Sequence, residues 1–354
     1  MAAQWDPTNL PIRPGLYVNF EEAAIAQING GDRGIVAMPL FTYTGGSATA
    51  KQFYTVENEA DAVTLFGSAN VQPIKFALQA GAAEVLVYTM PATPADADFV
   101  TMRNAFEARP FNVFVYPKGA ADAQEDSTLT WCKTNAGEGK HFMVVFGSDA
   151  TTDLDPTLGN ARSARLEDDY SVNLIVGGNV SGINYPSREY APYIAGLIAG
   201  KQINQSITYA VLPIDDVTKR LRNSEIKAAL QAGSLVISHD GEKAKIEQGL
   251  TTSGKKIRSI RARQAISTDL AKAARDNFIG QLSNNEAGQV ALIAAITAYL
   301  ETLENEDVLI LPDEDDTPAV RLDPTKESVG DAVFLLISYT EVDSMERIFI
   351  NIQL

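Results

Sequence analysis

The stretch that decides the fold covers residues 84–116 and reads EVLVYTMPATPADADFVTMRNAFEARPFNVFVY. Its ends, Glu84–Thr89 and Asn112–Tyr116, are short apolar runs rich in Val, Phe and Tyr, which favour strands. Between them lies a predicted helix, Ala97–Glu107, with residues at helical spacing on one face: Phe99, Met102, Arg103 and Phe106. A strand, a helix and a second strand in this order indicate an α/β fold.

The alternation of strands and helices continues outward, from about Glu21 to Ser238. Further strands are predicted over Arg33–Pro39, Phe142–Phe146, Val172–Val176 and Leu235–Ser238, and further helices over Gln72–Gln79, Ala191–Ala199 and Asp216–Gln231. The strands are near-continuous apolar runs, which is typical of strands that are buried on both faces. We therefore predict an α/β core, a mainly parallel sheet with flanking helices.

The sequence changes character after a polar stretch, Gly241 to Gly254, where we expect a short hairpin. Lys255 to Arg263 alternates Ile257 with basic residues and predicts a strand. Later helices are predicted over Thr268–Leu282 and Glu286–Glu304, and strands over Ala332–Tyr339 and Glu346–Leu354. These elements indicate a smaller α+β domain that begins near residue 250.

Four parts follow from this pattern: an N-terminal arm over residues 1–20, an α/β core domain over 21–250, a C-terminal α+β domain over 251–340 and a terminal strand over 341–354. The arm is rich in proline and ends in an alternating, strand-like run, Leu16-Tyr17-Val18-Asn19-Phe20. Because prolines stiffen an extended chain and cannot donate to a sheet, we expect an arm rather than a compact subdomain.

The composition indicates a globular protein whose main partner is not nucleic acid. Hydrophobic residues make up 45% of the 354 residues, and a formal net charge of −16 disfavours binding to a phosphate backbone. Cys132 is the single cysteine, so no intrachain disulfide is expected. The first residues lack the pattern of a signal peptide, and Val290 to Leu300 is too short to span a bilayer. We expect assembly in the cytosol.

Candidate catalytic motifs are weak. Gly249 to Lys255 ends in the Gly-Lys pair of a phosphate-binding loop, but Lys256 stands where Ser or Thr would bind magnesium, and a strand is predicted where that loop needs a helix. Ser238-His239-Asp240 are adjacent, whereas the members of a triad converge from separate segments. The acidic turn 313–316 has Pro318 where a calcium loop requires glycine.

We therefore predict no catalytic residue, no metal ligand, no cofactor and no enzymatic activity. A nucleotide-binding α/β enzyme that uses the Gly249–Lys255 turn remains an alternative, and a nucleotide-binding assay would test it.

The chain ends in an apolar strand. Ile348, Ile350, Ile352 and Leu354 fall on one face of it, whereas the termini of soluble domains are usually polar. Such a strand favours aggregation unless it has a partner. Two interpretations stay open: a hairpin with Ala332–Tyr339 in the same domain, or addition to the sheet of a neighbouring subunit.

Three stretches carry a resemblance to a known family. They are Ile12–Phe20 followed by Gly34–Ala37, the block from Ile266 to Glu306, and the closing run from Asp331 to Leu354. In order and position they resemble the tail-sheath proteins of contractile phages and of phage-tail-like (R-type) bacteriocins. The inserted outer domain of longer relatives is lacking, so the chain is most similar to the compact form.

The resemblance implies subunits that stack as rings of six around an inner tube and contract, driving the tube through a cell envelope. It implies a C-terminal domain next to the tube, and baseplate and tail terminator proteins as further partners in a phage tail or a released particle. Strand exchange between subunits would use Leu16, Tyr17, Val18, Asn19, Phe20, Arg347, Ile348, Phe349, Ile350, Asn351 and Ile352. A closed-ring binding module is the remaining alternative.

A basic segment lies within this acidic chain. Residues 255–275 hold seven Lys and Arg against Asp269 alone, a local charge of +6. We hypothesise that part of it faces an acidic tube through screened, easily broken contacts, with Lys272 and Arg275 on the contacting helix and Arg261 and Arg263 nearby. A solvated face is the other interpretation.

Overall fold

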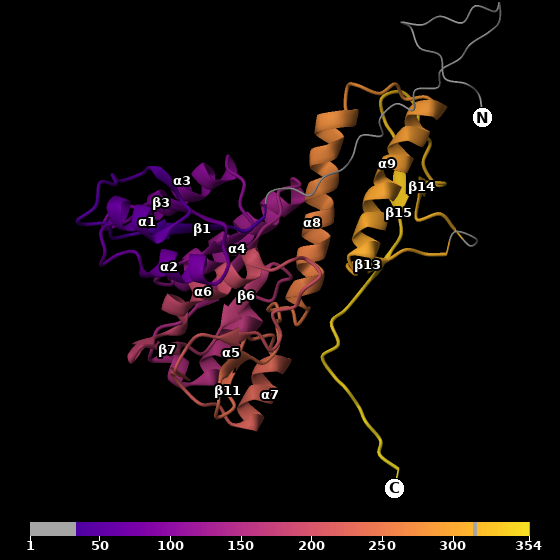
Figure 1. Cartoon of the computed structure of the whole chain (residues 1–354). Helices are drawn as coiled ribbons and strands as arrows, with labels where there is room; N and C mark the ends of the chain where they lie inside the picture. Colours follow the sequence, from indigo (N-terminus) through magenta and orange to yellow (C-terminus); the bar gives the residue numbers. More distant parts are fainter. Residues whose placement is uncertain (1–32, 314–316, 354) are drawn as a thin grey trace, which may run out of the picture.

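The structure is a computed structural model that describes residues 33–313 and 317–353 (Figure 1). The predicted N-terminal arm, with Leu16–Phe20, and the final residue lie outside the described residues. A central sheet with helices forms the larger part of the molecule, and two long helices with short strands form a second part beside it (Figure 1).

The central sheet is mainly parallel, as predicted. Its strands in spatial order are β2 (Phe53–Val56), β3 (Glu84–Thr89), β1 (Ile35–Leu40), β4 (Val113–Val115), β5 (Met143–Gly147) and β6 (Ser171–Leu174). Every neighbouring pair runs parallel except β2 with β3. Five predicted strands match β1, β3, β4, β5 and β6, whereas β2 was not predicted and the predicted strand Leu235–Ser238 lies in a separate small sheet, at β11 (Ile237–His239).

Helices cover both faces because successive side chains of each strand enter different cores. Val36 and Met38 of β1 lie in one core, and Ile35 and Ala37 lie in the other. The first core is covered by α1 (Glu59–Phe66), α2 (Gln72–Gln79) and α6 (Ser187–Gly200), and the second by α3 (Asp96–Glu107) and α4 (Asp122–Gly137). Next to β6, α5 (Pro156–Arg165) packs against α7 (Asn223–Gln231).

Two small antiparallel sheets complete the larger part. One contains β10 (Asp216–Val217), β7 (Gly178–Val180) and β8 (Ile183–Tyr185), and the other contains β11 (Ile237–His239), β12 (Ala244–Ile246) and β9 (Val211–Leu212). The predicted helix Asp216–Gln231 is therefore wrong at its start, because its first residues pair with β7. The expected hairpin forms between β11 and β12, earlier in the chain than predicted.

The second part is built on two long helices that lie side by side (Figure 1): α8 (Ile257–Ala273), which continues as the π-helix Ala274–Phe278, and α9 (Glu286–Asn305). Two short strand pairs accompany them: β13 (Leu309–Ile310) with β16 (Thr340–Glu341), and β14 (Val320–Leu322) with β15 (Leu335–Ile337). Within residues 33–313 and 317–353, no helix has the length and apolar character that crossing a membrane requires.

The strand predicted over Lys255–Arg263 is wrong, because α8 begins at Ile257. Ile257 and Ile260 join a core of the central sheet, whereas Ala262 and Ile266 join the core of the second part. The helix thus bridges two cores: the apolar side chains at its start pack into the larger part, and those further along pack into the second part. The basic residues that made the sequence resemble a strand are partly buried in this bridge.

A polar contact also joins the two parts. Asp269 of α8 accepts a hydrogen bond from Tyr299 of α9 at 2.6 Å and pairs with Arg33, just before β1, at 2.5 Å. Because Asp269 is buried, its charge needs these partners.

Candidate intersubunit linking site

The C-terminal segment leaves the body of the molecule as an extended chain (Figure 1). Ile348, Ile350 and Ile352 are 70%, 76% and 81% exposed, and Phe349 is 91% exposed. Burying one such side chain is worth about 1.5–3 kcal/mol. An exposed run of such side chains is therefore a candidate surface for binding a partner.

The segment has no strand partner among the described residues of its own chain. The last backbone hydrogen bond along the described chain runs from Val342 to Val308. The hairpin between Ala332–Tyr339 and the terminal strand is not formed, because β15 pairs with β14 instead. The backbone groups of residues 347–353 are thus left available for another sheet.

The second part of the molecule also offers edges that could accept a strand. Its two sheets have only two strands each, a size that is marginally stable alone. Apolar side chains stand exposed on them at Ile310, Leu322 and Leu336. Within the described chain, the outer edges of β13 and β14 pair with no other strand. The same molecule therefore has both an unpaired terminal segment and unpaired sheet edges to which such a segment could add.

The four basic residues predicted to face a tube differ in their surroundings. Arg261 is buried and donates to the carbonyl oxygens of Lys201 and Gln202, and burial lowers the pKa of Arg261 to about 10. Arg263 pairs with Glu341 of β16. These two arginines therefore hold α8 in place within the subunit.

Lys272 and Arg275 lie exposed at the C-terminal end of the same helical stretch. Their exposure leaves Lys272 and Arg275 as the candidates for the predicted tube contact.

The Gly249–Lys255 turn does not form a phosphate cradle. A helix does follow it, yet the amides of Thr251, Thr252 and Gly254 donate to the carbonyl oxygens of Lys255, Ser171 and Thr251 at 2.8, 2.8 and 2.9 Å. The Lys255 ammonium binds Asp169 at 2.6 Å. Because these groups already have partners within the protein, the turn lacks the free donors that phosphate needs.

The Ser238-His239-Asp240 run does not form a triad. Ser238 donates to Glu247, and Nδ1 of His239 accepts from the amide of Gly241 at 3.0 Å. Asp240 accepts from two turn amides and from Lys245, and these bonds hold the pKa of its carboxyl far below the usual range. The three side chains therefore stabilise the β11–β12 turn.

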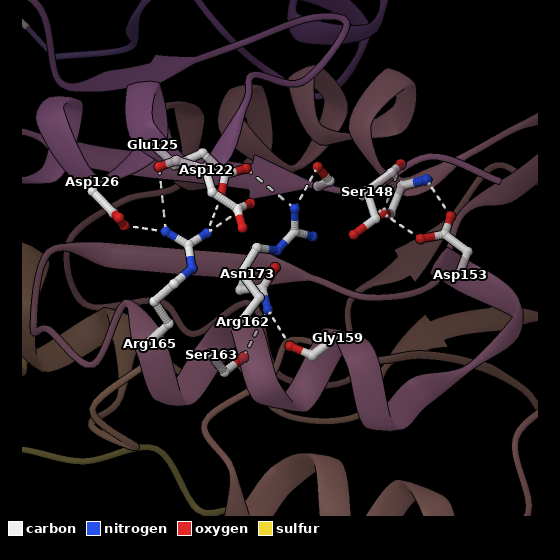
Figure 2. Close-up of polar contacts among 12 residues, drawn as sticks. Asp122, Glu125, Asp126, Ser148, Asp153, Gly159, Arg162, Ser163, Arg165 and Asn173 are labelled. Carbon is white, nitrogen blue, oxygen red and sulfur yellow. Dashed lines mark hydrogen bonds and ion pairs between the residues drawn. The ribbon is translucent and has the colours of Figure 1, made fainter. Parts of the chain in front are cut away.

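A hollow of about 700 Å³ lies beyond the carboxyl ends of β4 and β5, where open α/β sheets usually bind ligands. Figure 2 shows that two of the arginines that line it, Arg162 and Arg165, pair with carboxylates of the protein itself. Arg162 lies 3.2 Å from Glu125 and donates to the Gly147 carbonyl at 2.8 Å. Arg165 lies 2.5 Å from Glu125 and also pairs with Asp122 and Asp126.

These contacts tie α4 to α5 and to the end of β5, which is a structural role. In the part of the chain that the structure describes, no group of three or more His, Cys, Asp or Glu side chains could hold a metal ion. Most of the acidic turn 313–316 lies outside the described residues.

Known proteins similar to this chain are tail-sheath proteins. The family model of the phage tail sheath protein central domain matches residues 92–252, and that of the phage tail sheath C-terminal domain matches residues 251–354. The tail sheath protein of Clostridium phage phiCD119 is 23% identical over 377 residues, which cover 96% of this chain and 98% of that protein.

Solved structures of sheath proteins share the fold. The sheath tail protein of Desulfitobacterium hafniense has a TM-score of 0.76 at 19% identity, covering 95% of this chain and 99% of that chain. The helical sheath of the anti-feeding prophage in its contracted state has a TM-score of 0.71 at 14% identity, covering 98% and 99%. Because the two family models together span residues 92–354, the chain belongs to the phage tail sheath family: it is a structural subunit of the tail sheath of a contractile injection system, and not an enzyme.

Proposed function

We propose that the subunit polymerises as stacked rings of six around an inner tube, and that the sheath contracts to drive the tube through a cell envelope. The observation that carries this proposal is the bare apolar segment 347–353, which needs a partner outside its own chain. Similarity to a sheath in the contracted state and to the PVC sheath complex in the contracted state supports it.

Neighbouring subunits are linked by strand exchange. Arg347–Ile352 of one subunit adds to an open edge of the second part of its neighbour, where backbone hydrogen bonds hold the strand and alternate side chains set its register. Each such bond contributes only about 1 kcal/mol net, so the strength of the sheath comes from many links. Leu16–Phe20 is proposed to link at the other end of the chain.

The parts of the chain have different tasks in this scheme. Residues 21–250 form a core domain that rotates as a near-rigid body, residues 251–340 form the domain next to the tube, and 1–20 and 341–354 are linking segments. Lys272 and Arg275 contact the tube protein. Baseplate and tail terminator proteins bind the ends of the sheath, which assembles in the bacterial cytoplasm as part of a phage tail or tail-like particle.

Removal of residues 347–354 tests the linking role. The truncated chain should stay folded and monomeric and should form no tubes, as seen by negative-stain microscopy. A matched variant keeps the length but replaces Ile348, Ile350 and Ile352 by Asp, and it should behave in the same way. Tubes from either protein would show that the segment is not the link, and closed rings from the intact chain would favour a binding module.

A further inference from the structure

The free segment begins directly after a buried carboxylate. Only 8% of the Glu346 side chain is exposed, in contrast to the side chains that follow it. The boundary between held and free chain therefore lies at Arg347.

The Glu346 carboxylate is bound by residues from separate parts of the chain. Oε1 accepts a hydrogen bond from Thr208 Oγ1 at 2.8 Å, and Oε2 accepts from Gln248 Nε2 at 2.8 Å and lies 3.1 Å from Lys256 Nζ. Lys256 also binds Asp343 at 2.6 Å. One lysine thus holds two carboxylates of the same segment.

These partners lie outside the small sheet that the segment has just left. Thr208 follows α6, Gln248 follows β12, and Lys256 precedes α8. The chain therefore leaves β16, crosses to the larger part of the subunit, and is fastened there before it becomes free.

The contact favours the charged form of the carboxylate. Burial acts to raise the pKa of Glu346, but hydrogen bonds from Thr208, Gln248, Lys256 and Ser344 hold it below its ordinary value. Bonds to an ionised group are shorter and stronger than neutral ones, so this contact can hold an otherwise mobile segment.

We propose that Glu346 and Lys256 form an anchor that fixes where the linking segment leaves the subunit, so that only residues 347–353 move when neighbours exchange strands. The anchor rests on the linking role proposed above. A fixed starting point reduces the freedom that the strand must lose on binding, and it sets which side chains meet the neighbouring edge. Glu346 is thus a positioning residue for the link.

Trypsin cleavage after Arg347 measures the anchor without any assembly, on subunits kept below the concentration at which they polymerise. Glu346→Gln keeps the shape of the side chain and removes its charge, and Lys256→Met removes the partner. Both should speed cleavage about tenfold, because loss of charged hydrogen bonds favours local opening. Glu327→Gln makes the same charge change at an exposed site and should leave the rate unchanged.

A distance measurement gives a second readout. Cys132 is buried, so spin labels on Lys243→Cys and Ile352→Cys should report a narrower distance distribution in the parent protein than with Glu346→Gln. If Glu346→Gln and Lys256→Met change neither the rate of cleavage after Arg347 nor the width of the distance distribution, the proposal that Glu346 and Lys256 anchor the segment is wrong. If these variants free the segment but removal of residues 347–354 still permits tubes, the linking role fails instead. With both correct, Glu346→Gln should raise the concentration needed for assembly about tenfold.

Discussion

Glu125 shows how single charges stabilise the core domain. It lies on α4, is 1% exposed, and contacts both Arg162 and Arg165 (Figure 2). Burying a charge is costly, and the cost is offset only while opposite charges and hydrogen bonds surround it. Glu125 is therefore the buried centre of the ion pairs that join α4 to α5.

Glu125→Ala should lower the free energy of unfolding by about 3–5 kcal/mol, because it leaves two arginines without their shared buried partner. Urea unfolding followed by circular dichroism measures this loss. Glu138→Ala, at an exposed site just after α4, is the control and should change stability by less than about 0.5 kcal/mol. Equal effects from the two variants would contradict the assigned role.

Asp153 predicts a pH dependence of stability. Burial raises the pKa of Asp153 to about 6, although hydrogen bonds from Ser187 act in the opposite direction. The folded protein thus binds this proton more tightly than the unfolded chain does. The contribution of Asp153 is therefore fully present below the ordinary pKa, 3.8, and is lost as the pH rises through about 6.

Asp153→Asn should remove this dependence. Between pH 3.5 and pH 7, the stability difference between variant and parent should shift by about 3 kcal/mol in favour of the variant, at 1.36 kcal/mol for each pKa unit. Chemical unfolding at both pH values measures it, and a constant difference would exclude Asp153 as the source.

At the scale of elements, α2 and α6 depend on a close approach at Gly196. A Cβ atom there would lie 2.2 Å from the carbonyl oxygen of Ala77. Gly196→Ala should therefore force the helices apart and lower the free energy of unfolding by about 1–3 kcal/mol. Gly137→Ala in α4 is the matched control, since nothing lies within 4 Å of that Cβ position, and it should stabilise the protein by up to about 1 kcal/mol. Thermal unfolding would contradict the packing argument if both substitutions shifted the midpoint in the same direction.

Elements with a simple apolar pattern could be predicted, and those with polar buried faces could not. β3 and α2 were predicted at their observed bounds. α4 was missed because its buried face includes Glu125, Thr128 and Asn135, so it lacks an apolar stripe. The first part of α8, up to Arg263, was mistaken for a strand because Arg258 and Arg261 are buried where a helical pattern would place apolar residues, whereas its end lies in the predicted helix Thr268–Leu282.

The candidate site was likewise predictable only in part: the apolar terminal segment could be predicted, and the contacts that hold its start could not. The apolar spacing of Ile348, Ile350 and Ile352 predicted a segment that needs a partner, and the structure leaves it exposed. The anchor could not be predicted, because Thr208 and Glu346 lie 138 residues apart and neither has a distinctive local pattern. The one available signal was a glutamate placed directly before an apolar strand.

At the scale of the whole molecule, charge is divided between an acidic chain and a basic stretch around α8. Since Arg261 and Arg263 bind groups within the subunit, Lys272 and Arg275 are the residues of this stretch left for the proposed tube contact. Such exposed contacts are individually weak and are screened by salt, as the proposed sliding of a tube along this surface would require.

Reversing both charges, Lys272→Glu with Arg275→Glu, should impair assembly of the sheath around the tube while leaving the subunit folded. Co-sedimentation with the tube protein and electron microscopy measure the loss of assembly. The difference between variant and parent should become smaller at high salt, because salt also weakens the contact that the parent protein makes. The control, Lys227→Glu with Lys243→Glu, makes the same charge change at exposed sites of the core domain. If Lys272→Glu with Arg275→Glu assembles with the tube as well as the parent protein does, these two residues do not form the tube contact.

The free segment has a further, mechanical consequence. A fully extended chain spans at most about 3.3–3.6 Å per residue, so the described residues 347–353 reach at most about 23–25 Å from Glu346. If Glu346 stays fastened, this tether length limits how far a neighbour's acceptor edge can travel from the anchor. Under the proposed strand exchange, a neighbouring subunit that stays bound to residues 347–353 could therefore move no farther from Glu346 than this extended length.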